Sequence, residues 1–353
     1  MAIRPLAIAM VVLLAGASCA PGPNSVGSPA TATTVAPTAT FAPAIVTIGQ
    51  VGGISDAAIY VADAKGYFKE QGITLQSTTF ASAANMVAPL LRGDLLVGSG
   101  ASGAGIFNAI RTGTAMRIVA DKGTLSPGHG YEGLVVRTDE ADQIKSAKDL
   151  KGKTIALAAR DITPEVTLDT FLRTGGLTIK DVNVLVIPHP QMQATLQSKG
   201  IDAGLPIEPF LTSILESGVA KLLTRDDQVT PGFQTAVIFY AEQFAKQREL
   251  AVRFMTAYLK GARFVTDAYD KKDAAKKSEV VAILAKATGF EAALLDKVIL
   301  PGIDPNGRVN VASLEDTQKY LIAKGSQAAA IDLKAVVDMS FADEAVKVLG
   351  TYK

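Results

Sequence analysis

The sequence predicts an α/β fold built around mostly parallel sheets, and the alternation of two kinds of segment indicates it. From residue 44 onward, short runs rich in β-branched residues alternate with segments whose apolar residues recur every three or four positions. This alternation is typical of strands that are joined by helices. The chain has 353 residues, of which 48% are hydrophobic, so it is long and apolar enough for about two domains with buried cores. No internal repeat interrupts the pattern.

The net charge and the cysteine content exclude several classes of protein. Thirty-five Lys and Arg against 34 Asp and Glu give a net charge of +1, which attracts neither nucleic acid nor an anionic membrane surface. The single cysteine, Cys19, excludes disulfide frameworks, cysteine-based zinc sites and iron–sulfur clusters within the chain. His129 and His189 are too far apart in sequence to form a ligand pair on one helix. We therefore expect no nucleic-acid partner, no metal site and no cofactor.

Residues 1–19 are interpreted as a lipoprotein signal peptide. Arg4 supplies a positive charge, and the apolar run 6–14 is too short to span a bilayer as a permanent helix. Small residues then lead to Cys19, which resembles the lipobox of bacterial lipoproteins, although Gly16 stands where that pattern has an aliphatic residue. Lipidation of Cys19 would anchor the chain on the extracytoplasmic face of the cell membrane, each buried methylene adding about 0.8 kcal/mol of membrane affinity. The alternative is an ordinary secretory signal cut after Ala17.

Residues 20–43 (APGPNSVGSPATATTVAPTATFAP) are expected to form a flexible stalk. They carry no charge and consist mainly of Pro, Ala, Thr, Ser and Gly. Such a segment buries too little apolar surface to offset the entropy of ordering it. Its composition suits a spacer between a membrane anchor and a folded body.

Within the body, strands are expected where short apolar or β-branched runs end at glycine or polar residues: 45–50, 73–78, 95–98, 117–120, 133–137, 154–158, 182–187 and 236–240. Helices are expected to begin near residues 56, 82, 102, 163, 191 and 209. The start at Thr163 is well marked, since Pro164 stands at the first helical position and Glu165 in the first turn. Apolar residues stepping by three or four predict one long amphipathic helix over 247–269, and further helices follow over 270–353.

The order of several segments resembles a known family. These are DAAIYVADAKGYFKEQGITLQ, then LLRGDLLVGSGASGAGIFNAIRTGTAMRIVAD, then DLKGKTIALAA and GIDAGLPIEPF. They look like the substrate-binding proteins of ABC importers for nitrate, sulfonate, taurine and thiamine-pyrimidine precursors. The resemblance runs from about residue 45 to residue 269. It implies a type II periplasmic-binding-protein fold, in which two α/β lobes are joined by two crossings and hold a ligand in the cleft between them.

From this resemblance we expect three segments in the body: a first part of lobe 1 over 44–135, lobe 2 over 136–235, and a return to lobe 1 with C-terminal helices over 236–353. It also implies partners, namely an ABC permease and its ATPase, to which a small-molecule ligand is delivered. The membrane is then contacted only through the lipid anchor on Cys19.

Three strand-to-helix turns are candidate binding segments. Ligands of open α/β sheets bind outside the carboxyl ends of the strands, where helix N-termini offer free N–H groups. The first turn has two glycines followed by Asp56, the second (SGASG) contains Ser99 and Ser102, and the third, over 160–165, contains Thr163. Small residues in such turns also serve tight packing, and Asp56 is equally explained as a helix cap.

Three aromatic residues and an acid complete the candidate site: Tyr60, Tyr131, Phe210 and Glu208. Tyr131 and Phe210 follow loops, whereas Tyr60 lies on an apolar helix face, where core packing is the better explanation. The three turns contain a single cation, Arg160, whereas a compact oxyanion requires several donors and often a dedicated cation. Rings with acids and hydroxyls suit a heteroaromatic ligand. We expect a vitamin or its precursor, with riboflavin ahead of a thiamine pyrimidine precursor. An alkanesulfonate, taurine or nitrate anion is the alternative.

An enzyme on the same scaffold is the rival interpretation, because the resemblance extends to a pyrimidine-forming synthase of thiamine biosynthesis. That synthase carries a cysteine-rich iron motif, a cofactor lysine and a sacrificial histidine, whereas the body here has no cysteine. No nucleophile elbow, HExxH motif, phosphate loop or dinucleotide fingerprint is present. We therefore expect a binding protein and not an enzyme. A surface adhesion or sensory module would share the anchor and the stalk.

Overall fold

The computed structural model describes residues 41–353. The expected signal peptide, the expected lipidation site Cys19 and residues 20–40 of the expected stalk lie outside the described residues. The last three stalk residues are held against the body. The guanidinium of Arg253 donates to the carbonyl of Ala42 at 3.1 Å and lies over the ring of Phe41.

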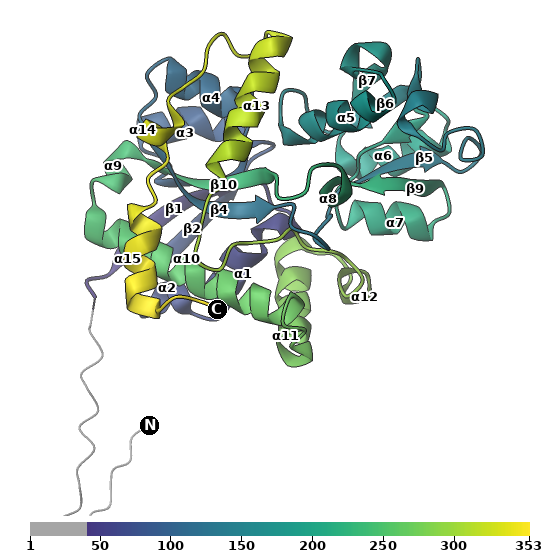
Figure 1. Cartoon of the computed structure of the whole chain (residues 1–353). Coiled ribbons are helices and arrows are strands. Elements are labelled where there is room, and N and C mark those ends of the chain that lie inside the picture. The colour runs from purple at the N-terminus through teal and green to yellow at the C-terminus, as the bar shows by residue number, and fades with distance from the viewer. Residues whose placement is uncertain (1–40) are drawn as a thin grey trace, which may run out of the picture. The chain divides into compact units, whose positions relative to one another are not determined.

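Two five-stranded sheets organise the fold, and they share one pattern (Figure 1). The first sheet has the order β2 (Ile73–Thr79), β1 (Ala44–Gln50), β3 (Val97–Ala101), β10 (Gln234–Ala241), β4 (Met116–Thr124). The second has the order β7 (Asn183–Val186), β6 (Thr154–Leu157), β8 (Ala203–Gly204), β5 (Gly133–Arg137), β9 (Ala220–Arg225). In each sheet three neighbouring strands are parallel, and the fourth in the order runs antiparallel to both of its neighbours.

Helices connect the strands and cover the sheets. The α-helices are α1 (Ala57–Ala64), α2 (Tyr67–Glu70), α3 (Val87–Arg92), α4 (Ala104–Arg111), α5 (Thr163–Thr174), α6 (His189–Gln197), α7 (Phe210–Glu216), α8 (Asp226–Val229), α9 (Glu242–Ala245), α10 (Arg248–Tyr269), α11 (Ala274–Thr288), α12 (Ala292–Leu295), α13 (Val311–Lys324), α14 (Leu333–Val336) and α15 (Ser340–Leu349). Short 3₁₀ helices are η1 (Ile54–Asp56), η2 (Ala83–Met86), η3 (Ala147–Leu150) and η4 (Ile179–Asp181).

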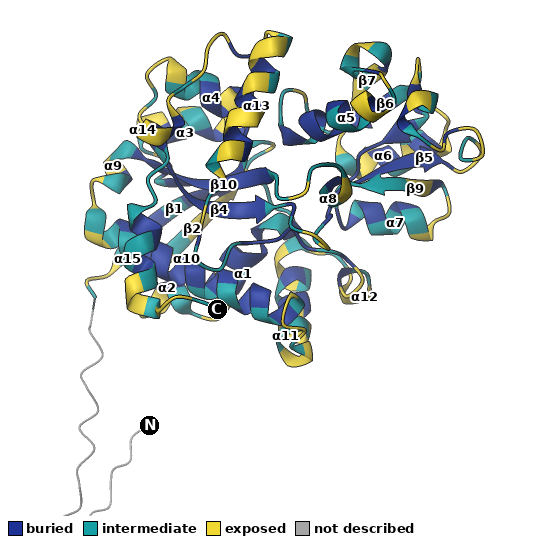
Figure 2. Cartoon of the chain, viewed as in Figure 1, coloured by how far each residue is buried: buried dark blue, intermediate teal, exposed yellow. Residues whose placement is uncertain are grey.

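The core of the first lobe, the first sheet with the helices packed on it, lies on both faces of that sheet. Alternate residues of β10 point to opposite faces, so Ile238 and Tyr240 join the cluster under α1 and α10, while Val237 and Phe239 join the one under α4 and α13. Figure 2 shows β4 and β10 dark between helices whose outer faces are exposed. Phe68, Phe244 and Phe254 are fully buried, and each contributes about 1.5–3 kcal/mol through burial.

The second lobe, the second sheet with its helices, repeats this arrangement on a smaller scale. Leu134 and Val136 of β5 pack toward α5, whereas Val135 between them packs toward α6 and α7. All three are almost fully buried, as expected for a sheet that is covered on both faces.

The chain changes sheet twice. It leaves the first sheet after Thr124 and enters the second at Gly133, then leaves at Arg225 and returns at Gln234. The expected boundaries after residues 135 and 235 fall inside β5 and β10, each of which belongs wholly to one sheet. The C-terminal helix α15 packs on α10 and so belongs to the first lobe.

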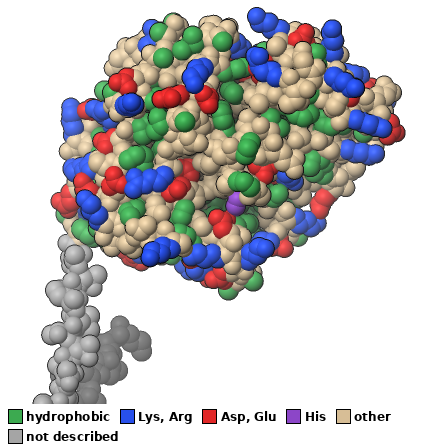
Figure 3. Space-filling view, in the orientation of Figure 1, with side chains coloured by type: hydrophobic (Ala, Val, Ile, Leu, Met, Phe, Trp, Pro, Cys, Tyr) green, Lys and Arg blue, Asp and Glu red, His purple; other side chains and the backbone are tan. Residues whose placement is uncertain are grey.

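The α/β class predicted from the sequence is confirmed, and eight of the ten strands lie where a strand is expected. Two are additional, β8 and β9. In the part of the chain that the structure describes, no helix has the length and apolar character needed to cross a membrane. Figure 3 shows basic and acidic side chains interspersed over the visible face, in keeping with the net charge of +1.

Candidate functional site

A cavity of about 560 Å³ lies between the two lobes. The first lobe lines it with residues 51–53 and 55 after β1, 81–84 after β2, and 101, 103, 105 and 106 after β3. The second lobe contributes 158–162 and 164 after β6, 189 and 190 after β7, and 207–210 after β8. The carboxyl ends of the parallel strands in both sheets therefore face one space, which is the position of ligands in open α/β sheets. Its volume is in the range of small-molecule sites.

Three of the eight predicted ligand residues line this cavity: Tyr131, Glu208 and Phe210. The other five, Asp56, Tyr60, Ser99, Ser102 and Thr163, are not part of its wall. Asp56, Ser99, Ser102 and Thr163 are at most 1% exposed, and they make contacts within the protein.

Asp56 forms an ion pair with Lys122, a residue that the sequence analysis did not select. Its Oδ1 lies 2.8 Å from the Nζ of Lys122, whose side chain is 2% exposed and lines the cavity. Ser99 donates to the same oxygen at 2.9 Å, and the backbone N–H of Gly52 donates to Oδ2 at 3.0 Å. Asp56 and Ser99 thus position the ammonium group of Lys122 at the cavity. The signal that would have revealed it is a lysine placed two residues after the apolar run 118–120 of β4.

Thr163, Ser102 and Tyr60 make contacts within the protein and do not line the cavity. The hydroxyl of Thr163 and the N–H of Ser102 both donate to the carbonyl of Thr235, each at 3.2 Å. The hydroxyl of Ser102 is buried and has no partner within residues 41–353. Tyr60 packs against the core of the first lobe, where burial and then the charge of Asp56 raise the pKa of its phenol well above the usual range.

An aromatic wall spans the cavity from lobe to lobe. Phe210, at the start of α7, lies 5.4 Å from Phe290 of the first lobe in an edge-to-face arrangement, measured between ring centroids. The ring of His189 is nearly parallel to that of Phe210, with the ring centroids 6.2 Å apart. Burial lowers the pKa of His189 to about 4, so its imidazole is neutral at pH 7. Tyr131 adds a further ring at 9% exposure.

Two carboxyl groups line the cavity beside these rings. Glu208 is 1% exposed; its Oε2 accepts from the N–H of Thr212 at 3.0 Å, while its Oε1 has no hydrogen-bond partner within the described chain. A guanidinium nitrogen of Arg225 is 3.6 Å from that oxygen. Burial raises the pKa of Glu208 above its usual value. Glu132 is the second carboxyl, at 3% exposure.

The expected cation Arg160 lines the cavity but is already paired. Its guanidinium donates to both oxygens of Glu165, at 3.0 and 3.1 Å. Burial alone would raise the pKa of Glu165, but Arg160 and Lys324 outweigh it and lower the pKa to about 2. Glu165 therefore neutralises the positive charge of Arg160 without a ligand.

Lys324 makes this cluster a contact between the lobes. It lies at the end of α13 in the first lobe, and its Nζ is 2.5 Å from both Asp161 and Glu165 in the second. Ser326 also donates to Asp161 at 2.5 Å. The backbone of Asp161 has a left-handed φ of +62°, and its carbonyl accepts from the N–H of Ala104 at 3.0 Å. The described arrangement is therefore one in which the lobes touch at the cavity edge.

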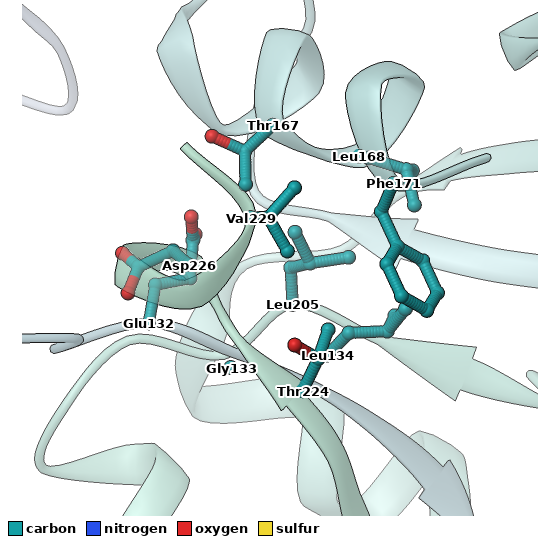
Figure 4. A pocket seen from close by; sticks show the side chains of 10 residues that line it. All are labelled: Glu132, Gly133, Leu134, Thr167, Leu168, Phe171, Leu205, Thr224, Asp226 and Val229. Carbon is teal, nitrogen blue, oxygen red and sulfur yellow. The ribbon is translucent and has the colours of Figure 1, made fainter. Parts of the chain in front are cut away.

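A pair of buried acids lies where the chain crosses between the lobes. Glu132 precedes β5 and Asp226 follows β9, and both border a second, much smaller cavity of about 10 Å³. Figure 4 shows their carboxyl groups on the same side of it, opposite Phe171. Burial raises the pKa of Asp226 to about 8 and that of Glu132 well above its usual value, the latter also because of Asp226. Space for about one water adjoins this pair.

Comparison with known proteins places the chain in a family and confirms its fold. A family model described as NMT1/THI5 like matches residues 54–271, which is more than half of the chain. The periplasmic nitrate-binding protein NrtA from Synechocystis PCC 6803 is 16% identical, with a TM-score of 0.72 over 87% of this chain and 89% of its own. The alkanesulfonate-binding protein SsuA from Xanthomonas axonopodis pv. citri, bound to MOPS, is also 16% identical, with a TM-score of 0.68 over 85% of this chain and 99% of its own.

The same fold occurs in an enzyme. The desulfurization enzyme DSZB is 18% identical, with a TM-score of 0.60 over 86% of this chain and 99% of its own. A search of curated proteins finds no match. The predicted resemblance and the type II periplasmic-binding-protein fold are confirmed by the family model and by these neighbours.

Proposed function

Because the chain belongs to the NMT1/THI5-like family and has a periplasmic-binding-protein fold, we propose that it is the extracytoplasmic substrate-binding component of an ABC importer. The observation that carries this proposal is the cavity of about 560 Å³ enclosed by both lobes, with small-residue turns from the first lobe and an aromatic wall to which both lobes contribute. A site of this size encloses a small molecule.

The ligand works by shifting the balance between open and closed lobes. It closes the cleft only as far as it binds the closed form more tightly than the open form. The segments 125–132 and 226–233 connect the lobes and are the hinge of this proposal. The closed surface is then what an ABC permease and its ATPase recognise. Cys19 as a lipid anchor keeps the protein at the outer face of the membrane.

We propose a neutral heteroaromatic ligand, with riboflavin as the first candidate. Phe210, Phe290 and Tyr131 offer apolar ring surface, while Glu208, Glu132 and Lys122 offer hydrogen bonds to carbonyl and N–H groups at a ring edge. Both lining cations are matched by acids, Lys122 by Asp56 and Arg160 by Glu165. A compact anion such as nitrate or a sulfonate would find no unmatched positive charge.

Flavin fluorescence tests the ligand. Riboflavin emission should be quenched on titration with the purified protein, with a dissociation constant near one micromolar, or about −8 kcal/mol. Unchanged emission at micromolar protein would exclude riboflavin, and parallel titrations with a thiamine pyrimidine precursor, taurine and nitrate would then identify the class. The enzyme alternative, which the fold of DSZB raises, predicts a new product after incubation, whereas a binding protein returns the ligand unchanged by mass spectrometry.

A further inference from the structure

Lys122 is the buried cation at the cavity, and its donors are not all used. It lies in β4, whose residues 118–123 are all buried, and its side chain is 2% exposed. One N–H of the ammonium group is directed to Asp56 at 2.8 Å and one to the hydroxyl of Ser55 at 3.1 Å. An ammonium group has three N–H donors. The third has no acceptor within residues 41–353, and Lys122 lines the cavity, so a ligand oxygen is a suitable acceptor for it.

Asp56 is fixed as the partner of that cation. It is fully buried, and its two oxygens accept from Ser99 of β3 and from the N–H of Gly52 after β1. Asp121, the acid next to Lys122 in sequence, does not pair with it, because consecutive strand residues point to opposite faces of the sheet. The side chain of Asp121 accepts instead from Gln234 at 2.5 Å and from the N–H of Asp304 at 2.6 Å. Lys122 and Asp56 therefore form one buried unit with no net charge.

The other cations near the cavity are already paired with acids, so they do not add to the positive charge of Lys122. Arg160 is matched by Glu165, and Lys324 is matched by Asp161 and Glu165. Glu132 and Glu208 are acids, so they add no positive charge. A buried charge is far costlier without its partner than with it. An anionic ligand would therefore have to compete with Asp56 for Lys122.

We infer that Asp56 sets the charge selectivity of the cavity: it cancels the charge of Lys122 while leaving one N–H donor, so the site accepts a neutral ligand oxygen and rejects anionic analogues. This inference rests on the proposed function, since it specifies the ligand class of the same cavity. Lys122 is the residue that contacts the ligand, and Asp56 is a positioning residue that acts through it.

The Asp56→Asn variant tests the inference. Asparagine keeps the size of the side chain and one accepting oxygen but removes the charge that matches Lys122. The wild-type protein is expected to bind riboflavin in preference to riboflavin 5′-phosphate, and the variant should shift this ratio toward the phosphate by about tenfold or more. It should also gain a rise in melting temperature on adding sulfate at constant ionic strength. The matched control is Asp94→Asn, whose carboxylate is paired with Arg92 on the exposed surface.

A second variant keeps the inference testable if Asp56→Asn does not fold. The double replacement Asp56→Asn with Lys122→Gln leaves no unmatched charge. It should bind riboflavin more weakly than wild type, retain the wild-type preference over the phosphate, and show no response to sulfate. An unchanged ratio and no sulfate response in Asp56→Asn, or a shift toward the phosphate in the double variant, would overturn the inference. Absence of riboflavin binding by the wild type would overturn the proposed ligand instead, while the sulfate response still decides the role of Asp56.

Discussion

The backbone of Gly103, in the first lobe, lies against the carbonyl oxygen of Asp161, in the second. A Cβ atom at Gly103 would lie 2.5 Å from that oxygen, well inside any real contact distance. Gly103 also forms a backbone bridge to Ile162. The small-residue turn after β3 therefore lets the two lobes meet at backbone distance.

Gly103→Ala should hold the lobes apart without disturbing either core. The added methyl group cannot be accommodated in the closed arrangement, so closure becomes less favourable and ligand affinity should fall about tenfold, equivalent to about 1.4 kcal/mol. Isothermal titration with the ligand measures this loss. The matched control is Gly204→Ala, whose Cβ would make ordinary contacts of 3.6–3.8 Å within the second lobe. Equal affinities for the two variants would contradict the prediction.

Lys324→Met should favour the open arrangement. The lysine bridges to Asp161 and Glu165 of the other lobe, and its removal leaves the buried Glu165 with Arg160 as its remaining cation. Small-angle scattering of the ligand-free variant should give a larger radius of gyration than that of wild type, and affinity should fall about three- to tenfold. Lys319→Met, which removes an exposed pair with Asp316 on the same helix, is the control. An unchanged radius of gyration would show that this contact does not bias the lobes.

Phe210→Ala should weaken ligand binding about 10- to 30-fold, since truncation of a central aromatic anchor typically costs about 2 kcal/mol. The control is Phe171→Ala, which alters a half-buried phenylalanine of the same lobe that borders the small cavity and not the large one. Fluorescence titration gives affinity, and thermal unfolding gives stability. If Phe171→Ala weakened binding as much as Phe210→Ala, the loss would reflect the stability of the lobe and not contact with the ligand.

Asp226→Asn should flatten the dependence of stability on pH. Burial raises the folded-state pKa of Asp226 to about 8, from an ordinary value of 3.8. Between these values the folded protein holds a proton that the unfolded chain has lost, so stability falls as pH rises from about 4 to about 8. One such proton corresponds to a slope of at most about 1.4 kcal/mol per pH unit.

Urea unfolding at pH 5, 6.5 and 8 would measure this slope. Relative to wild type, Asp226→Asn should become progressively more stable toward pH 8. Some slope should persist, because Glu132 still holds a raised pKa through its own burial. Asp94→Asn on the surface provides the reference. Parallel pH profiles for Asp226→Asn and wild type would mean that Asp226 titrates normally in the folded protein.

The strands are readable from the sequence where apolar or β-branched residues form a run, in the buried strand β5 and in the edge strand β7 alike. Gly133–Arg137 is predicted at its observed bounds, because an apolar Leu-Val-Val run stands between a glycine and an arginine. The two missed strands lack that signal. Ala203–Gly204 is only two residues long, and Ala220–Arg225 is an edge strand in which only Ala220 is buried. Their positions are set by pairing with β5 and not by their own composition.

The site was less predictable than the fold. Turns after parallel strands converge whatever their composition, so the location of the cavity followed from topology. Which side chains point into the cavity depends on the register in which the strands pair. Asp56 is only a few residues from the lining residues of its turn, yet its carboxylate is directed at Lys122, which is distant in sequence and comes from an adjacent element. Asp56 and Lys122 are 66 positions apart, and partners so far apart produce no local pattern in a single sequence.

The whole second sheet comes from one uninterrupted stretch of chain whose two ends are neighbours. Gly133, its first residue, pairs with Arg225, its last, across antiparallel strands. This stretch is therefore an insert whose two ends lie together, so the half of the protein that supplies Phe210 and His189 to the cavity is exchangeable as a unit between related chains. A grafted insert would change the molecule that is captured, while the half that contains residues 41–124 and 234–353 keeps its own surface.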